Sequence, residues 1–364
     1  MQVTKGRVLG QRFFDIADEI DLERARALVQ QSYRSVKLLR GSSHVRMPDP
    51  PIEWVLDAQP VGVAGYSAAQ CHLRLYDFGA VSVTFLLELP SPIGPEALVQ
   101  LSAELLDGAA ERALTDAAWP IVLALAQTVA PASRAAKISH LTEDYTIFWI
   151  SQTRPRMSAE QLRDALDIPR LLLGERGPLD AGERAHLNSP EARFTYGPDE
   201  LVVIDWNSAL IVDAGESWAL PILLEISTVQ LFELRVYDLM LERFLANLYE
   251  ELDPGRSRWL AERRYQRVLR QLIRLFIDVR EISDRIDNAL QFLGDSWLAR
   301  VHRAAVHTFE VPRWQAQLRH KLDALQQFNQ LLVDQVTTRK GLRLEWAIVL
   351  LIVVEILFGV FKIW

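Results

Sequence analysis

One carboxylate, Glu355, stands out among the residues that could do chemistry, because it lies inside a strongly apolar run. Residues 347–361 contain twelve Ile, Leu, Val and Phe side chains. Each favours membrane insertion by about 0.3 to 0.6 kcal/mol, whereas one central charge costs about 3 kcal/mol. Insertion is therefore favoured, and an acid in lipid then needs a partner. Gly359 lies one turn further along the same face, where a small residue allows close helix approach. We expect this face to meet a second helix in a homo-oligomer.

The other candidates do not form a recognisable catalytic or metal-binding set. Asp77-Phe78-Gly79 spells a kinase tripeptide, but without a glycine-rich loop or an HRD segment it indicates only a turn. Cys71 lies beside a predicted strand and is typical of a small core residue. The seven histidines are scattered, with no HExxH pattern and no acids at ligand spacing: His44, His72, His140, His186, His302, His307 and His320. The sequence predicts no catalytic residue, no cofactor and no metal, although a site assembled from distant residues would leave no local motif.

Residues 344–364 are expected to form a single transmembrane helix, a tail anchor. The stretch has roughly the 20 residues that a bilayer requires, and Trp346 and Trp364 would lie at the two interfaces, as indoles prefer. Three cations lie before the apolar run, Arg339, Lys340 and Arg343, and a single one, Lys362, lies after it. By the positive-inside rule, the amino-terminal bulk lies on the cytoplasmic side of the inner (cytoplasmic) membrane. The alternative is a core helix of a soluble bundle, because the apolar run is near the minimum span.

Composition excludes some classes of partner. The 40 Lys and Arg residues against 47 Asp and Glu residues give a net charge of -7 and no basic cluster, which argues against direct nucleic-acid binding. A single cysteine rules out an internal disulfide and suits a reducing compartment. The first residues lack an apolar stretch long enough for a secretion signal. The chain of 364 residues is long enough for two domains.

Residues 216–343 are predicted to be helical and to end in a long helical hairpin, a coiled-coil-like stalk. Apolar residues repeat at heptad a and d positions from Leu269, and a second such seam begins at Leu318. Asn329 occupies a position in the second seam, where a buried Asn fixes register at some cost in stability. An ordinary bundle core would give the same short pattern.

The helix predicted over residues 216–252 is apolar nearly all round in its first turns, which implies burial. Five polar residues interrupt it: Glu225, Gln230, Glu233, Arg235 and Asp238. Such groups can form a paired network or line a site, but ion pairing along the helix surface is the favoured interpretation.

Residues 1–215 are predicted to form a mixed α/β domain. Two passages show strand, turn and strand in succession, LRLYDFGAVSV and LVVIDWNSALIV, which is typical of hairpins. Each follows a strand and a helix and precedes another helix, so the pattern is β-α-β-β-α twice, close to a ferredoxin-like unit. Ser158 and Gln161 have the spacing of a capping box. Residues 115–132 are apolar, but the stretch is short, and a buried segment is favoured over a second span. The predicted class is therefore α+β, with a duplicated front domain, a helical hairpin and one transmembrane helix.

The closing stretch RLEWAIVLLIVVEIL resembles the terminal block of the required-for-meiotic-nuclear-division family. The segments QRFFDIADEIDLERARAL, LYDFGAVSVTF and EDYTIF are similar to that family's amino-terminal landmarks. Eukaryotic members carry a Ser-His-Ala-Leu-Ala-Gln-Ser block, and LLEISTVQLFELRVYD stands in its place here, which indicates a divergent, bacterial branch. The resemblance implies an inner-membrane protein without known catalysis, whose mitochondrial relatives resemble assembly factors that support organellar translation.

The sequence thus predicts a membrane-anchored, self-associating scaffold or assembly factor that presents a cytoplasmic α/β domain to an unknown protein partner. One alternative is an oligomeric ion channel or transporter with a ring of Glu355 side chains along its pore. A single, strongly apolar span offers a poor water-lined surface, so the scaffold is preferred. A further alternative is an enzyme that uses the clefts between the two β-α-β-β-α halves.

Overall fold

The computed structural model describes residues 1–32, 37–38, 50–63, 65–187, 189, 192–195, 197–251 and 296–327. The described residues form two compact units. The first contains those up to Val236 together with residues 296–314, and the second contains residues 237–251 and 315–327. The predicted transmembrane helix over residues 344–364 and most of the predicted stalk lie outside the described residues.

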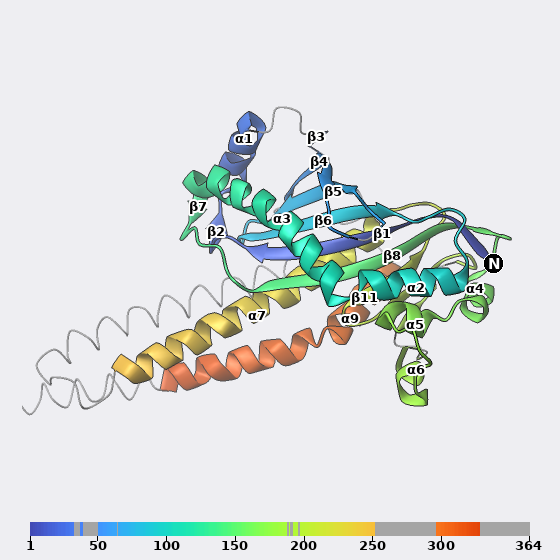
Figure 1. The fold of residues 1–364 in the computed structure, drawn as a ribbon. Helices are drawn as coiled ribbons and strands as arrows, with labels where there is room; N and C mark the ends of the chain where they lie inside the picture. The colour runs from blue at the N-terminus through green and yellow to red at the C-terminus, as the bar shows by residue number, and fades with distance from the viewer. Residues whose placement is uncertain are drawn as a thin grey trace, which may run out of the picture. The chain divides into compact units, whose positions relative to one another are not determined.

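A nine-stranded mixed sheet organises the first unit, in the order β3-β4-β5-β6-β1-β8-β11-β10-β9 (Figure 1). Among the described residues, β8 and β11 pair in parallel and every other neighbouring pair is antiparallel. A second sheet has two short strands, β2 (Glu19–Ile20) and β7 (Ser133–Arg134). The nine strands are β1 (Gln2–Asp15), β3 (Lys37–Leu38), β4 (Ile52–Pro60), β5 (Ala68–Leu75), β6 (Ala80–Glu88), β8 (Thr142–Arg154), β9 (Arg193–Phe194), β10 (Leu201–Ile204) and β11 (Ser208–Val212).

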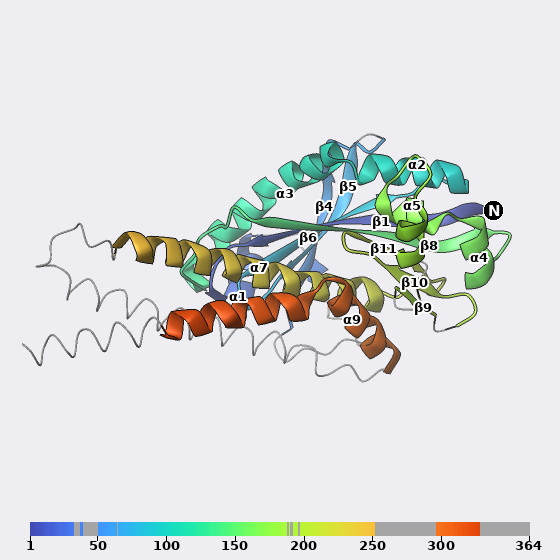
Figure 2. The same cartoon turned by 90° about the horizontal axis from the view of Figure 1, so that it is seen from below.

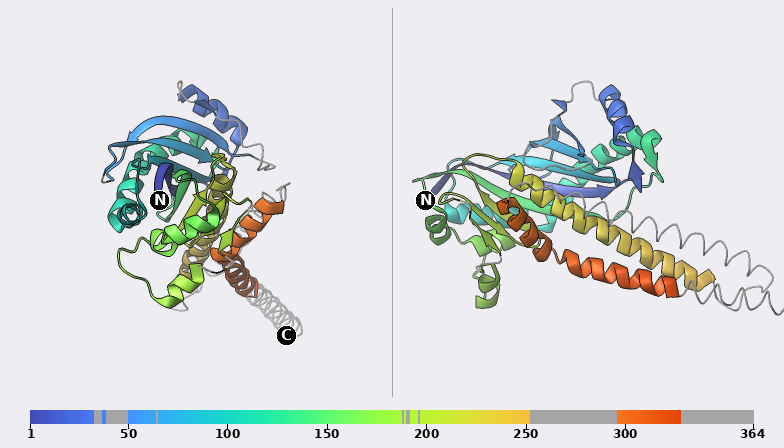
Figure 3. Two further views of the ribbon diagram at one scale, coloured as in Figure 1. Left: turned by 90° about the vertical axis from the view of Figure 1, so that its right-hand side faces the viewer. Right: turned by 180° about the vertical axis from the view of Figure 1, so that it is seen from behind.

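Helices cover both faces of this sheet, as the views in Figures 2 and 3 show. One face packs against helices that precede residue 190, and side chains such as Val83 and Leu73 join Leu114 and Val122 in a common core. These helices are α1 (Leu22–Ser32), α2 (Pro95–Leu105), α3 (Gly108–Val129), the 3-10 turn η1 (Ala130–Ala132), α4 (Ala159–Ala165), α5 (Ile168–Leu173) and α6 (Ala181–Leu187). The other face is covered by the first part of α7 (Ala219–Glu251) and by α9 (Ser296–Thr308). The α+β class expected from the sequence is confirmed.

The central strand β1 is buried on both faces. It pairs with β6 on one side and with β8 on the other, and every side chain from Val8 to Phe14 is buried. A strand that is covered on both faces does not need to alternate apolar and polar residues. Gln11 and Arg12 are therefore buried together with their apolar neighbours.

Both predicted hairpins are present, and each turns at the predicted tripeptide. β5 and β6 flank Asp77-Phe78-Gly79, and β10 and β11 flank the turn at Asp205. The capping box at α4 is also confirmed, because Ser158 Oγ accepts from Gln161 N at 3.3 Å and Gln161 Oε1 accepts from Ser158 N at 3.0 Å. The chain after this capping box forms two short helices, since Asp167 caps a new helix, α5, at Ile168.

The apolar stretch predicted as a buried segment forms most of α3. Within the described residues, one helical stretch, Gly108–Ala132, is long and apolar enough to cross a membrane by length and composition. One side of it is buried against the sheet through residues such as Leu114 and Val122, while Trp119 and Leu123 are exposed. The helix therefore serves as a one-sided core element of the first unit.

The second unit contains the end of α7 and part of a following helix. Lys321 Nζ lies 2.6 Å from Asp238 Oδ1 and 2.8 Å from Glu242 Oε1, so one cation holds two carboxylates of α7. Leu241 is buried, and so are the leucines of the predicted second seam at positions 318, 322 and 325. Because these leucines are three and four residues apart, they lie on one helix face.

Candidate functional site

Glu225 of α7 is the centre of a charged cluster buried between α7 and the sheet. Its side chain is 1% exposed, and that of Arg74 on β5 is 3% exposed. Arg74 donates through one terminal nitrogen to Glu225 Oε2 and through the other to Glu53 Oε1 on β4. An arginine fork of this kind can serve two carboxylates at once because its donors point in fixed directions.

Three neutral groups complete the hydrogen bonding of the Glu225 carboxylate. Gln11 Nε2 donates to Oε2 at 3.2 Å, Tyr76 Oη donates to Oε1 at 3.1 Å, and the Ser82 hydroxyl also donates to Oε1. Burial and the nearby Glu225 carboxylate raise the pKa of Tyr76 far above its usual range, so it remains a neutral donor. Burial lowers the pKa of Arg74, but Glu225 and Glu53 raise it by more, and the guanidinium stays charged.

Strand pairing explains how these residues meet. Arg74 lies directly opposite Glu53 on one side and Ser82 on the other. Since side chains alternate across a strand, the neighbours Leu73 and Leu75 enter the opposite core. The cluster thus places the first turns of α7 over β4, β5 and β6. Each charge is already paired and enclosed, so the arrangement fixes structure and does not present a reactive group.

A second group of acids surrounds Glu233, about two turns further along α7. Its side chain is buried, and burial together with Asp15, Asp18 and Asp77 raises its pKa well above the usual range. The pKa of Asp15 is raised to about 7: burial is the main cause and Asp18 adds to it, while a hydrogen bond with the Ala17 backbone and the charge of Lys137 act against it. Both carboxyl groups therefore hold a proton in mildly acidic solution.

Stability is expected to fall as pH rises from about 4 to about 7, because Asp15 has its ordinary pKa of 3.8 in the unfolded chain and about 7 in the folded one. In that window the folded protein binds more protons than the unfolded one. Each such group therefore lowers the free energy of unfolding by up to about 1.4 kcal/mol for every pH unit of increase. Unfolding temperatures measured across the window should show a flatter profile for Asp15→Asn. The exposed Asp116→Asn on α3 is the matched control. Parallel profiles for wild type and Asp15→Asn would contradict the assignment.

Arg235 makes a third contact between α7 and the sheet. Its guanidinium bonds the Glu143 carboxylate on β8 and lies 6.0 Å from the centre of the Trp314 ring. Burial raises the pKa of Glu143 to about 7, although Arg235 opposes this. Three of the five polar residues of α7 therefore pair with other elements: Glu225 and Arg235 with strands, and Asp238 with Lys321. The expectation of ion pairing along the helix surface is wrong for these three, because the helix is buried and its polar groups face strands or another helix.

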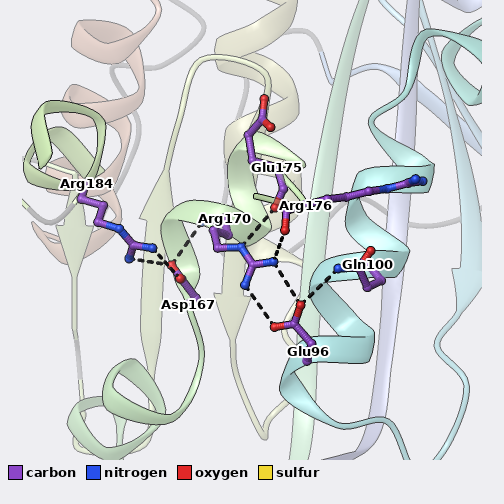
Figure 4. Close-up of polar contacts among 7 residues, drawn as sticks. All are labelled: Glu96, Gln100, Asp167, Arg170, Glu175, Arg176 and Arg184. Carbon is purple, nitrogen blue, oxygen red and sulfur yellow. Dashed lines mark hydrogen bonds and ion pairs between the residues drawn. The ribbon is translucent and has the colours of Figure 1, made fainter. Parts of the chain in front are cut away.

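Charges around α5 form a separate network at the surface (Figure 4). Arg170 donates to both oxygens of Glu96 at 3.0 Å and to the carbonyl oxygens of Glu175 and Arg176. Arg184 binds both oxygens of Asp167, at 3.1 and 2.8 Å. Glu96 is 67% exposed, and ion pairs that water reaches contribute little to stability. The network fastens α5 to α2 and α6, and its donors are used within the protein.

An open cavity of about 450 Å³ lies at the carboxyl ends of β8 and β11. These strands are parallel, so both ends meet at one edge of the sheet, which is where ligands bind in open α/β sheets. The cavity is lined by Thr4, residues 150–154, Arg156, Met157, Asp199, Val212 and Ala214. All of these residues belong to the first unit.

A β-bulge shapes the wall of this cavity. The pairing of β1 with β8 shifts between Lys5 and Gly6, which pair with Gln152 and Ile150, so Ser151 is left over in the ladder. Bulges of this kind redirect side chains and are common beside functional sites. Next to the bulge, the side chains of Lys5 and Arg7 both form salt bridges with Glu216, whose backbone has a positive φ of 52°.

Other types of site receive no support from the described residues. No group of three His, Cys, Asp or Glu side chains in that part of the chain is arranged to hold a metal ion. Cys71 is buried, as predicted for a core residue, and burial raises the pKa of its thiol to about 12. A thiol with so high a pKa is protonated at neutral pH and is a poor nucleophile.

The family model of the N-terminal domain of the uncharacterized protein MJ0711 matches residues 5–218. The chain belongs to this family. It is also 25% identical over 176 residues to the uncharacterized protein MJ0711 of Methanocaldococcus jannaschii, which is 48% of this chain and 53% of that protein. The chain thus spans about half the length of this relative. No solved structure gives a significant match.

The range matched to the MJ0711 family ends just before α7 begins. Gln11, Arg74 and Ser82 lie inside the matched residues, whereas their carboxylate partner Glu225 lies beyond them. Every residue that lines the cavity lies inside the matched range except Thr4.

All of the site residues that the sequence predicts lie outside the described residues: Asn329, Trp346, Glu355, Gly359 and Trp364. Sequence reasoning missed the cluster of Arg74 and Glu225. A signal was present, since an acid in a helix that is apolar all round must be buried, and a buried acid needs a partner. The cavity had no comparable signal, because its lining comes from several separate segments.

Proposed function

We propose that this protein is a membrane-anchored, self-associating scaffold or assembly factor without catalytic activity. The observation that carries the proposal is the apolar stretch over residues 344–364, in which Glu355 and Gly359 are four residues apart and would share one face of a helix. A carboxylate is costly in lipid and is best accommodated between helices of neighbouring copies. Asn329 would set the register of the helices that lead to the membrane. The unit built on the nine-stranded sheet would then be held at the cytoplasmic face of the inner membrane.

The resemblance to the required-for-meiotic-nuclear-division family supports this proposal. The resemblance implies an inner-membrane protein without known catalysis, and the mitochondrial relatives resemble assembly factors. The partner would be another protein, since a net charge of -7 disfavours nucleic acid.

We also propose that the first unit derives from a duplicated, ferredoxin-like β-α-β-β-α element. In support, both hairpins turn at similar tripeptides, Asp77-Phe78-Gly79 and Asp205-Trp206-Asn207, and a helix follows each, α2 after the first and α7 after the second. The two copies would have diverged in strand pairing. The first strand of the first copy, β1, is antiparallel to β6, whereas that of the second, β8, is parallel to β11.

The full chain is expected to sediment with membranes and to resist extraction by salt, whereas a variant without residues 344–364 is expected in the supernatant. Glu355→Leu should reduce the oligomeric size in mild detergent, because it removes the polar group that favours helix contact. Val353→Leu, a conservative change in the same apolar run, is the matched control and should leave the size unchanged. Recovery of the complete chain as a monomer in a detergent-free supernatant would overturn the proposal.

The same reagents test the alternative of an ion channel or transporter. Full chain reconstituted in liposomes should show no ion flux if it is a scaffold. Flux that disappears in Glu355→Gln but persists in Val353→Leu would favour the channel, because it would place the carboxylate along the pore.

A further inference from the structure

We infer that the cavity at the carboxyl ends of β8 and β11 binds a phosphate-bearing ligand. This inference stands on the geometry of the first unit and does not depend on the membrane anchor. The cavity volume of about 450 Å³ lies within the range of roughly 300 to 1,000 Å³ that small-molecule sites occupy. A phosphate group with a modest organic substituent would fill it.

The position of the cavity favours a ligand site. β8 and β11 are the parallel pair of the described sheet, and the cavity opens where both of them end. Neighbouring loops diverge at such a strand end and leave a crevice that the sheet itself does not fill. The bulge at Ser151 lies at the same edge and interrupts the alternation of the strand. Consecutive residues, from 150 to 154, therefore line the wall.

The charges of the wall favour an anion. Two arginines and one aspartate line the cavity, so it carries one net positive charge. Asp199 is paired with Arg156, which is 81% exposed at the rim. Arg154 is the second arginine of the lining. A planar guanidinium can donate two hydrogen bonds to one phosphate group, which makes arginine the preferred side chain for this ligand.

Among the acids next to the cavity, Glu216 is matched by cations. Glu216 is held by Lys5 and Arg7. Asp213 accepts from the backbone nitrogens of Gly215 at 2.7 Å and Ser217 at 2.8 Å. Two cations therefore stand against the one charge of Glu216, whereas Asp213 keeps its negative charge and has its oxygens occupied by backbone donors.

The remaining lining residues match the rest of such a ligand. Thr4 and Thr153 contribute hydroxyl groups, which can donate to phosphate oxygens. Ile150, Met157 and Val212 contribute apolar surface that can contact an organic substituent. A phosphate ester combines these two requirements, whether it is a soluble metabolite or the headgroup of a phospholipid.

Isothermal titration calorimetry on the full chain in detergent tests the inference with two probes, inorganic pyrophosphate and a short-chain phosphatidic acid. Wild type should bind at least one of them. Arg154→Ala should weaken that binding by at least about tenfold, because a charge-assisted hydrogen bond is lost. The double variant Arg156→Ala with Asp199→Ala should weaken it as well, without leaving an unpaired carboxylate at the rim. Binding of pyrophosphate would assign a soluble ligand, and binding of phosphatidic acid alone would assign a lipid headgroup.

Arg163→Ala is the matched control, because Arg163 is a partly exposed arginine on α4 that pairs with Glu160 and is not part of the lining. It should bind the probes as wild type does. Unfolding temperatures without probe should be equal for all variants, which separates loss of binding from loss of fold. Failure of wild type to bind either probe, or equal binding by Arg154→Ala and Arg163→Ala, would overturn the inference.

Discussion

Replacing Arg74 with methionine is expected to lower the free energy of unfolding by about 3 to 5 kcal/mol. Methionine keeps much of the side-chain volume but leaves Glu225 and Glu53 without their cation. The Glu225 side chain is 1% exposed and that of Glu53 is 10% exposed, so water cannot replace the lost guanidinium. Removing one partner of a buried ion pair is far more costly than the net value of the pair, because an uncompensated charge stays behind. Denaturant titration followed by near-ultraviolet circular dichroism measures the change.

The matched control for this prediction is Arg170→Met. Arg170 also binds a carboxylate with two hydrogen bonds, but its partner Glu96 is 67% exposed. The loss there should be much smaller than for Arg74→Met, because water reaches the carboxylate that is left behind. Adding Glu225→Gln to Arg74→Met should recover part of the stability, since it removes the stranded charge. Equal losses for Arg74→Met and Arg170→Met would show that the buried cluster does not carry the stability assigned to it.

The local elements of this fold could be predicted from the sequence because their causes are local. The capping box joins Ser158 to Gln161, three residues apart, and the hairpin at Asp77-Phe78-Gly79 needs only a turn between two strands. The long helix α7 was also predicted, since its apolar residues and its length leave few alternatives. These signals depend on neighbours in the chain and do not require knowledge of the sheet.

The sheet order and the ionic cluster could not be predicted in the same way. Arg74 and Glu225 are 151 residues apart, and they meet because β5 and α7 occupy facing layers. Nothing in the sequence around β8 indicates that its neighbour is β11, which pairs with it in parallel. The cavity depends on that pairing. Arg154 and Arg156 are two residues apart in the sequence, but nothing there indicates that Asp199, Val212 and Ala214 line the same cavity. Local patterns predict elements, whereas a site made by distant strands requires the topology.

Gly79→Ala is expected to lower the free energy of unfolding of the first unit by at least about 4 kcal/mol. Few single substitutions cost as much. Gly79 has a φ of 96°, where a side chain is disfavoured. A Cβ atom on its backbone would lie 1.6 Å from the carbonyl oxygen of Ala17 and 2.7 Å from its carbon. Those atoms belong to the backbone, so the hairpin turn and the segment after β1 would have to separate.

That separation would break specific hydrogen bonds, which is why the expected loss exceeds the strain of the turn alone. Ile16 N donates to Gly79 O at 3.1 Å, and Ile20 N donates to Asp77 O at 2.6 Å. Gly65 provides the matched control, because it also has a positive φ, of 81°, but an added Cβ would meet nothing within 4 Å. Gly65→Ala should cost only the backbone strain, about 1 to 2 kcal/mol. Thermal unfolding of the two variants distinguishes the effects, and a Gly79→Ala protein as stable as Gly65→Ala would mean that the turn does not pack against Ala17.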